Sequence, residues 1–277
     1  MGNAQGNGKD FSRQGYSLPW RYSPTLLLLM GMMSNSATVL QACPSAENSC
    51  VCQGSQMITC NAVGATNFHF LATGVEMHLC FSLSITYNIL SEIPSDIFLN
   101  LGLIKLEELV LRNNGISTLQ NNSFNGLVNL KHLDLSRNLL SHIHPAAFNS
   151  CCNNINILQL SYNSLREIEF LSKLNRLQSF SAAFNNISSL NETTFDNCWQ
   201  LKSINLSHNE IRNISEGAFQ NIIDLSELNL SSNYLTNLNF MESLKNIKYL
   251  YVSENRISKI QNEFDLRLCA CLLVFPR

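Results

Sequence analysis

Asparagine and leucine recur at a regular spacing over most of this chain, and this period constrains the fold more than any other feature. One asparagine per unit marks the register, and successive markers are 26, 24, 25, 22, 24, 24 and 22 residues apart. Such a period is typical of a solenoid, because one short unit cannot bury its own apolar edge and must stack against copies of itself. The eight markers are Asn88, Asn114, Asn138, Asn163, Asn185, Asn209, Asn233 and Asn255.

The unit that begins at Leu130 illustrates the pattern. Leu130, Leu133 and Leu135 have the spacing of an inward-facing strand, Asn138 follows, and Leu140 turns back into the interior. The marker amide can both donate and accept, so it can satisfy backbone groups of neighbouring turns that would otherwise be buried unpaired. Five units carry a phenylalanine ten residues after the marker, and the two 22-residue units omit it: Phe98, Phe124, Phe148, Phe195 and Phe219.

These units resemble the leucine-rich-repeat template, in which an asparagine follows the strand leucines. The resemblance implies an α/β solenoid: a right-handed horseshoe with a parallel β-sheet on its concave face and irregular, 3-10 or loop structure on its convex side. A generic α/β domain that happens to be rich in leucine and asparagine would not give eight matches in phase.

Four cysteines stand immediately before the repeats, at Cys43, Cys50, Cys52 and Cys60. Their position predicts a disulfide-stapled cap over the end of the array, with a zinc site as the alternative. The cluster is similar to the N-terminal flanking module of extracellular leucine-rich-repeat proteins of the Slit, Toll and chaoptin type. That resemblance implies pairing of Cys43 with Cys52 and of Cys50 with Cys60, whereas the sequence alone allows three pairings.

The chain divides into four predicted segments. Residues 1–42 form a polar lead and a signal-peptide region, in which basic residues precede an apolar run that starts at Leu26. A disordered tail with a chance leucine cluster is the alternative. Residues 43–79 form the cysteine-rich cap, 80–262 the eight repeats, and 263–277 an incomplete C-terminal cap or tail.

The last segment contains Cys269 and Cys271 but lacks the closing tryptophan and further cysteines of a C-terminal cap. It therefore indicates a truncated or variant chain, or a poorly capped end. We expect fraying after Ile257 and self-association through this uncapped end.

Three further cysteines, Cys80, Cys151 and Cys198, fall at core-facing repeat positions. Cys151 and Cys198 lie two repeats apart, roughly 10 Å at sheet spacing, which is too far for a disulfide. We expect buried free thiols, and the pattern does not account for Cys152.

A row of residues just before the markers is the candidate binding surface. Arg137, Tyr162, Phe184 and His208 are consecutive in this row, about 4.8 Å apart at strand spacing. Aromatic residues and arginine on the concave face are typical of a binding hot spot. Alternatively, the rings lie flat on neighbouring strand residues and only shield the sheet. Residues beside the row predict a mixed-charge surface suited to a protein partner: Arg112, His132, Asp134 and Gln159.

Six glycosylation sequons also restrict the surface. Two of them, at Asn205 and Asn229, are predicted to face outward from mid-strand positions, where glycans would obstruct the sixth and seventh repeats. A partner is therefore expected over repeats two to five. The six acceptors are Asn121, Asn186, Asn191, Asn205, Asn213 and Asn229.

Composition excludes several functions. Charged residues are 14 % of the chain and the net charge is −2, so there is no basic excess and nucleic acid is not an expected partner. No apolar run is long enough to span a bilayer. His142 and His144 lack a third ligand, and no catalytic motif is present, so we expect no metal, no cofactor and no enzyme activity.

The predicted function is that of a secreted, extracellular protein-binding module for recognition or adhesion. Its ligand is expected to be an extracellular or cell-surface protein held on the concave face. Two alternatives are a non-catalytic subunit or inhibitor of a soluble enzyme, and an ectodomain fragment of a membrane receptor.

Overall fold

The computed structural model describes residues 50–53, 56–72, 77–148, 152–258 and 272–274 of the 277 residues. All of them belong to one structural unit, Leu40–Arg277. The predicted signal-peptide region lies outside the described residues, as do Cys43, Cys151, Cys269 and Cys271.

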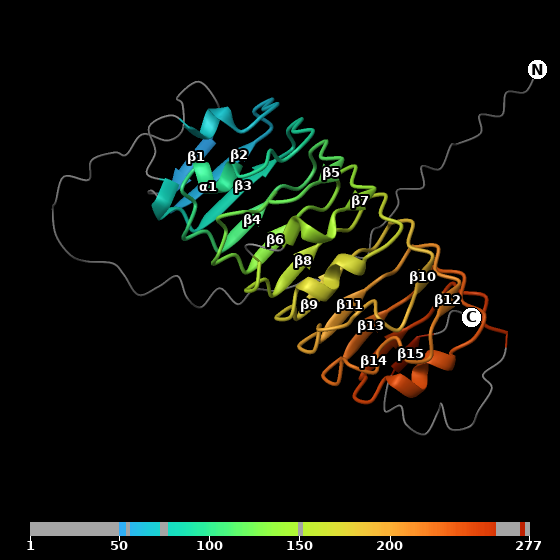
Figure 1. Cartoon of the computed structure of the whole chain (residues 1–277). Helices are drawn as coiled ribbons and strands as arrows, with labels where there is room; N and C mark the ends of the chain where they lie inside the picture. The colour runs from blue at the N-terminus through green and yellow to red at the C-terminus, as the bar shows by residue number, and fades with distance from the viewer. Residues whose placement is uncertain (1–49, 54–55, 73–76, 149–151, 259–271, 275–277) are drawn as a thin grey trace, which may run out of the picture. The chain divides into compact units, whose positions relative to one another are not determined.

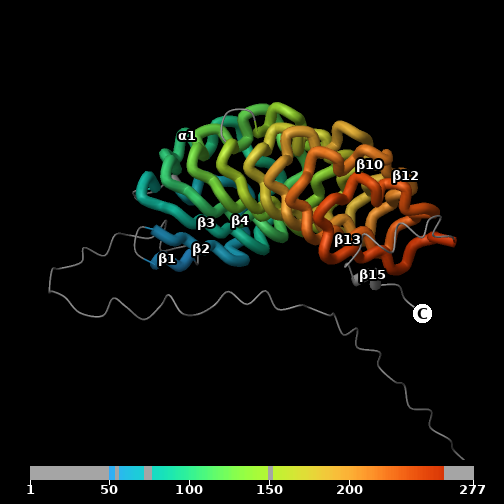
Figure 2. Tube along the Cα trace, turned by 90° about the horizontal axis from the view of Figure 1, so that it is seen from below, coloured from blue at the N-terminus to red at the C-terminus, as the bar shows by residue number. Residues whose placement is uncertain are grey.

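One open sheet of eleven strands runs through this unit in the order β1-β2-β3-β4-β6-β8-β9-β11-β13-β14-β15. The first pair is antiparallel and all later pairs are parallel. Figure 1 shows the strands side by side in chain order, and Figure 2 shows the turns stacked into an arch with the sheet along its inner side. The predicted solenoid is thereby confirmed. The strands are β1 Cys50–Gln53, β2 Met57–Asn61, β3 Ser82–Thr86, β4 Glu108–Val110, β6 His132–Asp134, β8 Ile157–Gln159, β9 Ser179–Ser181, β11 Ser203–Asn205, β13 Glu227–Asn229, β14 Tyr249–Tyr251 and β15 Leu272–Val274.

The outer side of the arch consists of short elements and loops, as predicted. Two small parallel sheets form there, β5 with β7 and β10 with β12. The remaining elements are single turns of helix. The bounds are β5 Thr118–Leu119, β7 His142–Ile143, β10 Ser189–Leu190, β12 Asn213–Ile214, α1 Ile97–Asn100, η1 His69–Ala72, η2 Met77–Leu79, η3 Pro145–Phe148, η4 Glu169–Lys173 and η5 Asn239–Ser243.

Alternation along each short strand divides core from solvent. In β6 the middle residue Leu133 is fully buried and its neighbours His132 and Asp134 are half-buried. The same pattern recurs in β4, β8, β9, β11 and β13. Since side chains alternate between the two faces of a strand, one face of the sheet covers the apolar core and the other is available to a partner.

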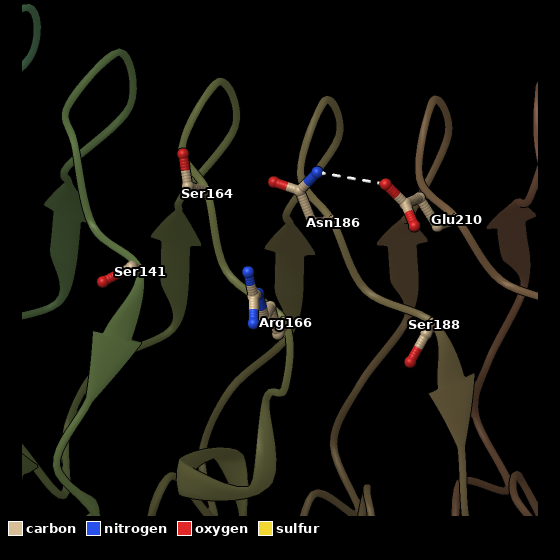
Figure 3. Close-up of a pocket in the computed structure, with 6 residues that line it drawn as sticks. All are labelled: Ser141, Ser164, Arg166, Asn186, Ser188 and Glu210. Atoms are coloured by element: carbon tan, nitrogen blue, oxygen red, sulfur yellow. Dashed lines mark hydrogen bonds between the residues drawn. The ribbon is translucent and has the colours of Figure 1, made fainter.

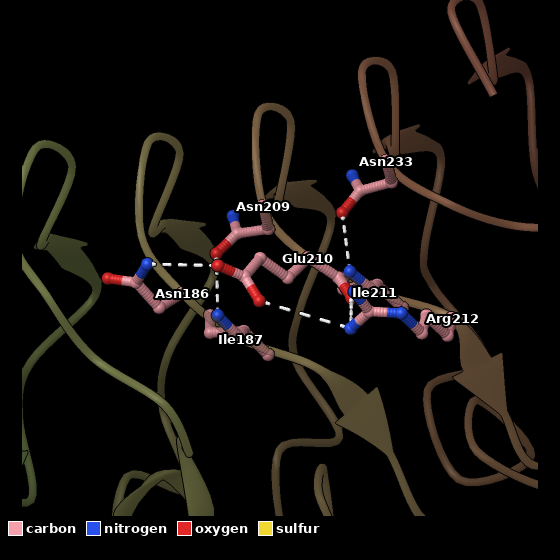
Figure 4. A network of polar contacts seen from close by, with 7 residues as sticks. All are labelled: Asn186, Ile187, Asn209, Glu210, Ile211, Arg212 and Asn233. Atoms are coloured by element: carbon pink, nitrogen blue, oxygen red, sulfur yellow. Dashed lines mark hydrogen bonds and ion pairs between the residues drawn. The ribbon is translucent and has the colours of Figure 1, made fainter.

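The marker asparagines link consecutive repeats, as the sequence predicts. In Asn138, Nδ2 donates to the carbonyls of Leu111 (2.9 Å) and Leu135 (3.0 Å), and Oδ1 accepts from the backbone N–H of Ile116 at 3.1 Å. Figure 4 shows the same acceptor contact at Asn209 and Asn233, from the N–H groups of Ile187 and Ile211. Each amide thus satisfies buried backbone groups in its own repeat and in the preceding one.

Buried phenylalanines fill the outer half of the core. All five that stand ten residues after a marker are buried, and the 22-residue repeats also supply a buried phenylalanine, at a position that the sequence analysis did not identify. Phe170 in η4 and Phe240 in η5 occupy the same layer, with ring centroids 5.6 Å from Phe148 and 5.8 Å from Phe219 respectively. A 3-10 turn brings the ring inward after seven residues instead of ten, so a shorter outer arc suffices. Phe68 packs edge-on against Phe98 and extends the layer into the N-terminal region.

A disulfide joins Cys50 to Cys60 across β1 and β2, the pairing that the resemblance implies. Cys52 is also in a disulfide, and its expected partner Cys43 lies outside the described residues. Cys80 and Cys198 are buried free thiols, as predicted. Burial raises the pKa of Cys80 to about 11 and that of Cys198 to about 12.

The core position predicted for Cys151 is occupied by Cys152, which is 1 % exposed and disulfide-bonded. The parallel register shows why: Leu158 of β8 pairs with Leu133 of β6, so Cys152 corresponds to the buried Leu127 one repeat earlier. The sequence pattern had not explained Cys152, and Cys151 itself lies outside the described residues.

At the C-terminal end, β15 pairs with β14 in parallel over three residues. The expected fraying after Ile257 therefore does not extend to Leu272–Val274, which cover the edge of the last repeat. Residues 259–271 lie outside the described part, and self-association through this end stays a prediction.

Candidate functional site

The row of residues before the markers lies at the turn that follows each concave strand. The sequence placed these residues on the strands themselves, whereas β8 ends at Gln159, before Tyr162 is reached. Arg137, Tyr162, Phe184 and His208 all have left-handed backbone conformations, with φ of 55°, 60°, 57° and 54°. This conformation lets the chain turn back under the sheet. It also aligns the four side chains beside the carboxyl-terminal ends of the strands.

The four side chains form one continuous stack, which we call the stacked row. The guanidinium carbon of Arg137 lies 4.1 Å from the ring centroid of Tyr162. The Tyr162 and Phe184 rings are 4.3 Å apart at an interplanar angle of 7°, and Phe184 and His208 are 4.0 Å apart at 9°. The rings therefore stack on one another and do not lie flat on the strands.

Exposure shows which part of each ring meets solvent. Phe184 has a neighbouring ring against each face and is still 39 % exposed, and Tyr162, between Arg137 and Phe184, is 41 % exposed. With both faces covered, the exposed surface is the ring edge and, for Tyr162, its hydroxyl. The row presents ring edges and polar groups to solvent.

The polar groups of the stacked row are available for binding. Within the described residues, the side chains of Arg137, Tyr162 and His208 form no hydrogen bond and no ion pair. The donor groups of these three side chains therefore lie at the carboxyl-terminal ends of the strands and have no acceptor within the described residues.

The other predicted binding residues occupy the concave strands or the turn beside them. His132 Nδ1 lies 3.0 Å from Glu108 Oε1 on the adjacent strand, and Asp134 Oδ1 accepts from the N–H of Ser136 at 2.8 Å. Asp134 and Gln159 are side by side in the register of β6 and β8. Arg112, after β4, is exposed. The structure thus brings these residues onto the face that adjoins the stacked row.

A second feature, which the sequence analysis missed, is an open polar groove on the outer flank of the same repeats (Figure 3). Its volume is about 700 Å³. Its lining comes from positions one and three residues after successive markers, and these meet only when the repeats stack. The lining residues are Ser141, Ser164, Arg166, Asn186, Ser188 and Glu210.

Glu210 contacts one residue of the preceding repeat and one of its own repeat. Its Oε1 accepts from Nδ2 of Asn186 at 3.2 Å, and its Oε2 lies 3.9 Å from the Arg212 guanidinium (Figure 4). Asn186 and Arg212 are exposed and Glu210 is half-buried, so these contacts shape the groove without closing it.

The sequon asparagines fall on several surfaces. Asn205 and Asn229 end β11 and β13 rather than standing in mid-strand, and their Oδ1 atoms accept from the N–H groups of Ser207 and Ser231. Asn186 lines the polar groove, and Asn191 accepts from the N–H of Thr193 in a turn. Asn121 is exposed and Asn213 begins β12. Attachment of glycans at these positions stays a prediction.

No helix in the described part of the chain has the length and apolar character needed to cross a membrane.

Comparison with known families and proteins gives one clear result. The family described as "Leucine rich repeat" matches four overlapping segments, residues 82–140, 104–165, 129–187 and 175–235. Two curated receptors are similar over a shorter stretch. Leucine-rich repeat-containing G-protein coupled receptor 5 of Rattus norvegicus is 39 % identical over 83 residues, which are 30 % of this chain and 9 % of the receptor. Toll-like receptor 9 of Mus musculus is 39 % identical over 89 residues, 31 % of this chain and 8 % of the receptor. The match thus spans less than a tenth of either receptor.

Solved structures share the fold. The leucine-rich repeat domain of APL1B superposes with a TM-score of 0.66 at 21 % identity, covering 80 % of this chain and 63 % of that one. Human 5T4, a trophoblast glycoprotein, gives 0.65 at 23 % identity, with 78 % and 82 % covered. TLR13 in complex with ssRNA13 gives 0.61 at 24 % identity, with 66 % and 26 % covered.

Proposed function

Because the chain belongs to the leucine-rich-repeat family, we propose that it is an extracellular, non-catalytic module that binds a protein partner. The partner lies across the concave strands β4, β6, β8 and β9 and contacts the stacked row at Arg137, Tyr162 and Phe184, which follow β6, β8 and β9. His208, the last member of the row, follows β11 and borders this footprint. The observation that carries this proposal is the unbroken stack of exposed, internally unpaired side chains across four successive repeats.

The stacked row has the properties of a binding hot spot. Tyrosine and arginine are enriched among residues that dominate binding energy, and here they are held in place by their neighbours. Since the rings are already stacked in the free protein, little side-chain freedom is lost when a partner docks. Preorganisation of this kind raises affinity without any change of backbone.

Two further features support the placement. The disulfide between Cys50 and Cys60 suits an oxidising, extracellular compartment. Glycans at Asn205 and Asn229 would stand on β11 and β13, beside the proposed footprint, and would leave β4, β6, β8 and β9 open.

The test uses the secreted full chain as bait against a panel of cell-surface and extracellular proteins. The double variant Tyr162→Asn/Phe184→Asn and its parent both carry Ser164→Ala, because Tyr162→Asn would otherwise create a glycosylation sequon with Ser164. We expect affinity of the double variant for the captured partner to fall at least about tenfold, which is roughly 1.4 kcal/mol. Asparagine is chosen because it tolerates the left-handed conformation of both positions.

The matched control is Tyr249→Asn, an exposed tyrosine on β14 at the far end of the sheet. We expect its affinity to stay within about twofold of the parent, within the usual range for a residue outside a hot spot. Equal affinity of the double variant and the parent would place the footprint elsewhere and refute the proposal.

A second candidate role, a segment of a receptor ectodomain, is favoured by the similarity to two receptors. It predicts a membrane-spanning segment in the full-length transcript. Sequencing the 3′ end of that transcript tests it, and a stop codon directly after the codon for Arg277 would exclude it for this product.

A further inference from the structure

We propose that the stacked row recognises an extended acidic segment of its protein partner, with one carboxylate seated on the Arg137 guanidinium and carbonyl or carboxylate oxygens along the ring edges. This inference rests on the proposed function and adds the chemistry of the partner. It follows from how the rings are exposed, which residue composition alone does not reveal.

The first step concerns the rings. An aromatic ring has a negative face and a positive edge. In Phe184 both faces are covered, by Tyr162 at 4.3 Å and by His208 at 4.0 Å, and the residue as a whole is still 39 % exposed, so the part of the ring that meets solvent is its positive edge. In Tyr162 the Arg137 guanidinium covers one face at 4.1 Å and Phe184 the other. The surface offered by these rings therefore favours oxygen acceptors.

The second step concerns the unpaired donors. The Arg137 guanidinium makes no ion pair within the described residues, although Asp134 is on the strand that leads to it. The Asp134 carboxylate accepts the N–H of Ser136 instead. A guanidinium has a planar fork of N–H groups that matches a carboxylate with two parallel hydrogen bonds. Tyr162 adds a hydroxyl, and the His208 ring adds an N–H, further along the same line.

The third step concerns shape. The donors lie in one line because the repeats stack in parallel register, at separations of 4.0–4.3 Å between neighbouring groups. An extended peptide advances about 3.3–3.6 Å per residue, so a segment of about four residues spans the row. A linear segment thus fits better than a convex surface.

Other ligand classes fit less well. Nucleobases bind single-strand sites by stacking on aromatic faces, and here the faces of Tyr162 and Phe184 are occupied. A polyanion such as a sulfated glycan or a nucleic acid backbone needs several cations along its path. In the stacked row Arg137 is the only arginine or lysine. One guanidinium followed by ring edges suits one or two carboxylates in a peptide.

The experiment measures binding of fluorescein-labelled hexaglutamate and hexaglutamine to the secreted full chain by fluorescence anisotropy. We expect hexaglutamate to bind at least about tenfold more tightly than hexaglutamine, as for the loss of one charge-assisted bidentate contact. Arg137→Gln should remove this preference. The matched control is Arg256→Gln, which removes a guanidinium lying 4.5 Å from the Tyr234 ring, outside the row, and should change the affinity less than about twofold.

Phe184→Leu tests the ring edges separately, because leucine keeps an apolar side chain but has no positive rim. We expect a loss of about threefold or more for hexaglutamate and no change for hexaglutamine. Thermal unfolding of each variant establishes that the repeats remain folded. If the two peptides bind equally, or if Arg137→Gln and Arg256→Gln reduce binding equally, the inference is wrong.

Competition extends the test to other ligands. Displacement of hexaglutamate from the parent by oligothymidine or by maltohexaose at equal concentration would also overturn the inference. The proposed function has its own readout. A partner whose binding depends on Tyr162 and Phe184 but not on the Arg137 charge would refute the acidic segment alone, whereas a partner indifferent to both rings would refute the proposed function.

Discussion

Replacement of Asn138 by alanine isolates the contribution of one marker amide to the fold. Its side chain is 5 % exposed and makes contacts in both directions along the chain. The backbone N–H of Ile116 has Oδ1 of Asn138 as its acceptor at 3.1 Å, so the substitution leaves this N–H buried without a partner. An orphaned buried donor costs about 1–3 kcal/mol.

The carbonyl groups are affected less. Leu111 O still accepts from Asn114 Nδ2 and Leu135 O from Asn163 Nδ2, each at 3.0 Å. Each carbonyl therefore loses one of two donors, which adds a smaller term. We expect Asn138→Ala to lower the free energy of unfolding by about 2–4 kcal/mol.

Asn114→Ala is the matched comparison at the preceding repeat. Oδ1 of Asn114 is a buried atom without a hydrogen-bond partner, so no backbone N–H loses an acceptor. The donors lost there served carbonyls, and a carbonyl short of a donor is tolerated better than an N–H without an acceptor. We therefore expect Asn114→Ala to cost about 1 kcal/mol less than Asn138→Ala.

Urea unfolding followed by circular dichroism measures both variants, with an unchanged m-value as the condition for reading the midpoint as stability. Native-state hydrogen exchange at the Ile116 amide is the specific readout. In Asn138→Ala, exchange at the Ile116 amide should accelerate by more than exchange at the Leu133 amide, which lies in the repeat of Asn138 itself. Equal costs for the two variants, or an Ile116 amide that stays as protected as in the parent, would refute the reasoning.

Three other substitutions or conditions have defined outcomes. Phe170→Ala should lower the free energy of unfolding by about 3–5 kcal/mol in urea titrations, because the ring is buried and no neighbour can fill its place; a cost under about 1 kcal/mol would show that η4 can collapse. Gly126→Ala should destabilise more than Gly102→Ala in thermal unfolding: both have positive φ, but a Cβ at Gly126 would lie 2.7 Å from Leu99 Cα, whereas none lies within 4 Å at Gly102. Equal effects would show that strain alone decides. Burial raises the pKa of Cys198 from 9.0 to about 12, so its contribution to stability is complete below pH 9 and is lost as the pH rises toward 12. Iodoacetamide at pH 8 should leave Cys198 unmodified until urea unfolds the chain, and rapid labelling of the folded protein, read by mass spectrometry, would contradict this.

The sequence predicted what depends on local periodicity. Marker asparagines and strand leucines such as Leu133 lie where the period places them, since each repeat presents the same short pattern and parallel stacking leaves one register. The inference failed where the path of the outer arc matters. Phe170 and Phe240 enter the core from 3-10 turns seven residues after their markers, and nothing at the marker specifies that turn. Two adjacent cysteines, one of them Cys152, likewise fit the core position equally well until the length of the arc is known.

The candidate site was predictable in composition but not in geometry. A row of Arg137, Tyr162, Phe184 and His208 follows from counting residues before each marker. That its members stack face to face depends on their side-chain rotamers, which the repeat period does not specify. The left-handed turn, by contrast, recurs directly before each of the eight markers. The polar groove around Arg166 was missed because its side chains come from different repeats and share no sequence motif.

The left-handed backbone of the stacked row is unfavourable for aromatic residues. A left-handed conformation costs a non-glycine residue roughly 1–2 kcal/mol, and asparagine tolerates it best. Asn113 occupies this position one repeat before Arg137, with φ 58°. Stacking of Phe184 on its two neighbours returns about 0.5–1.5 kcal/mol per contact, which offsets the backbone strain and little more. For the fold alone, asparagine at Tyr162 and Phe184 would serve nearly as well, which is why that double variant should bind weakly yet unfold near the parental temperature. That outcome would assign the aromatic rings of the row to contacts outside the chain.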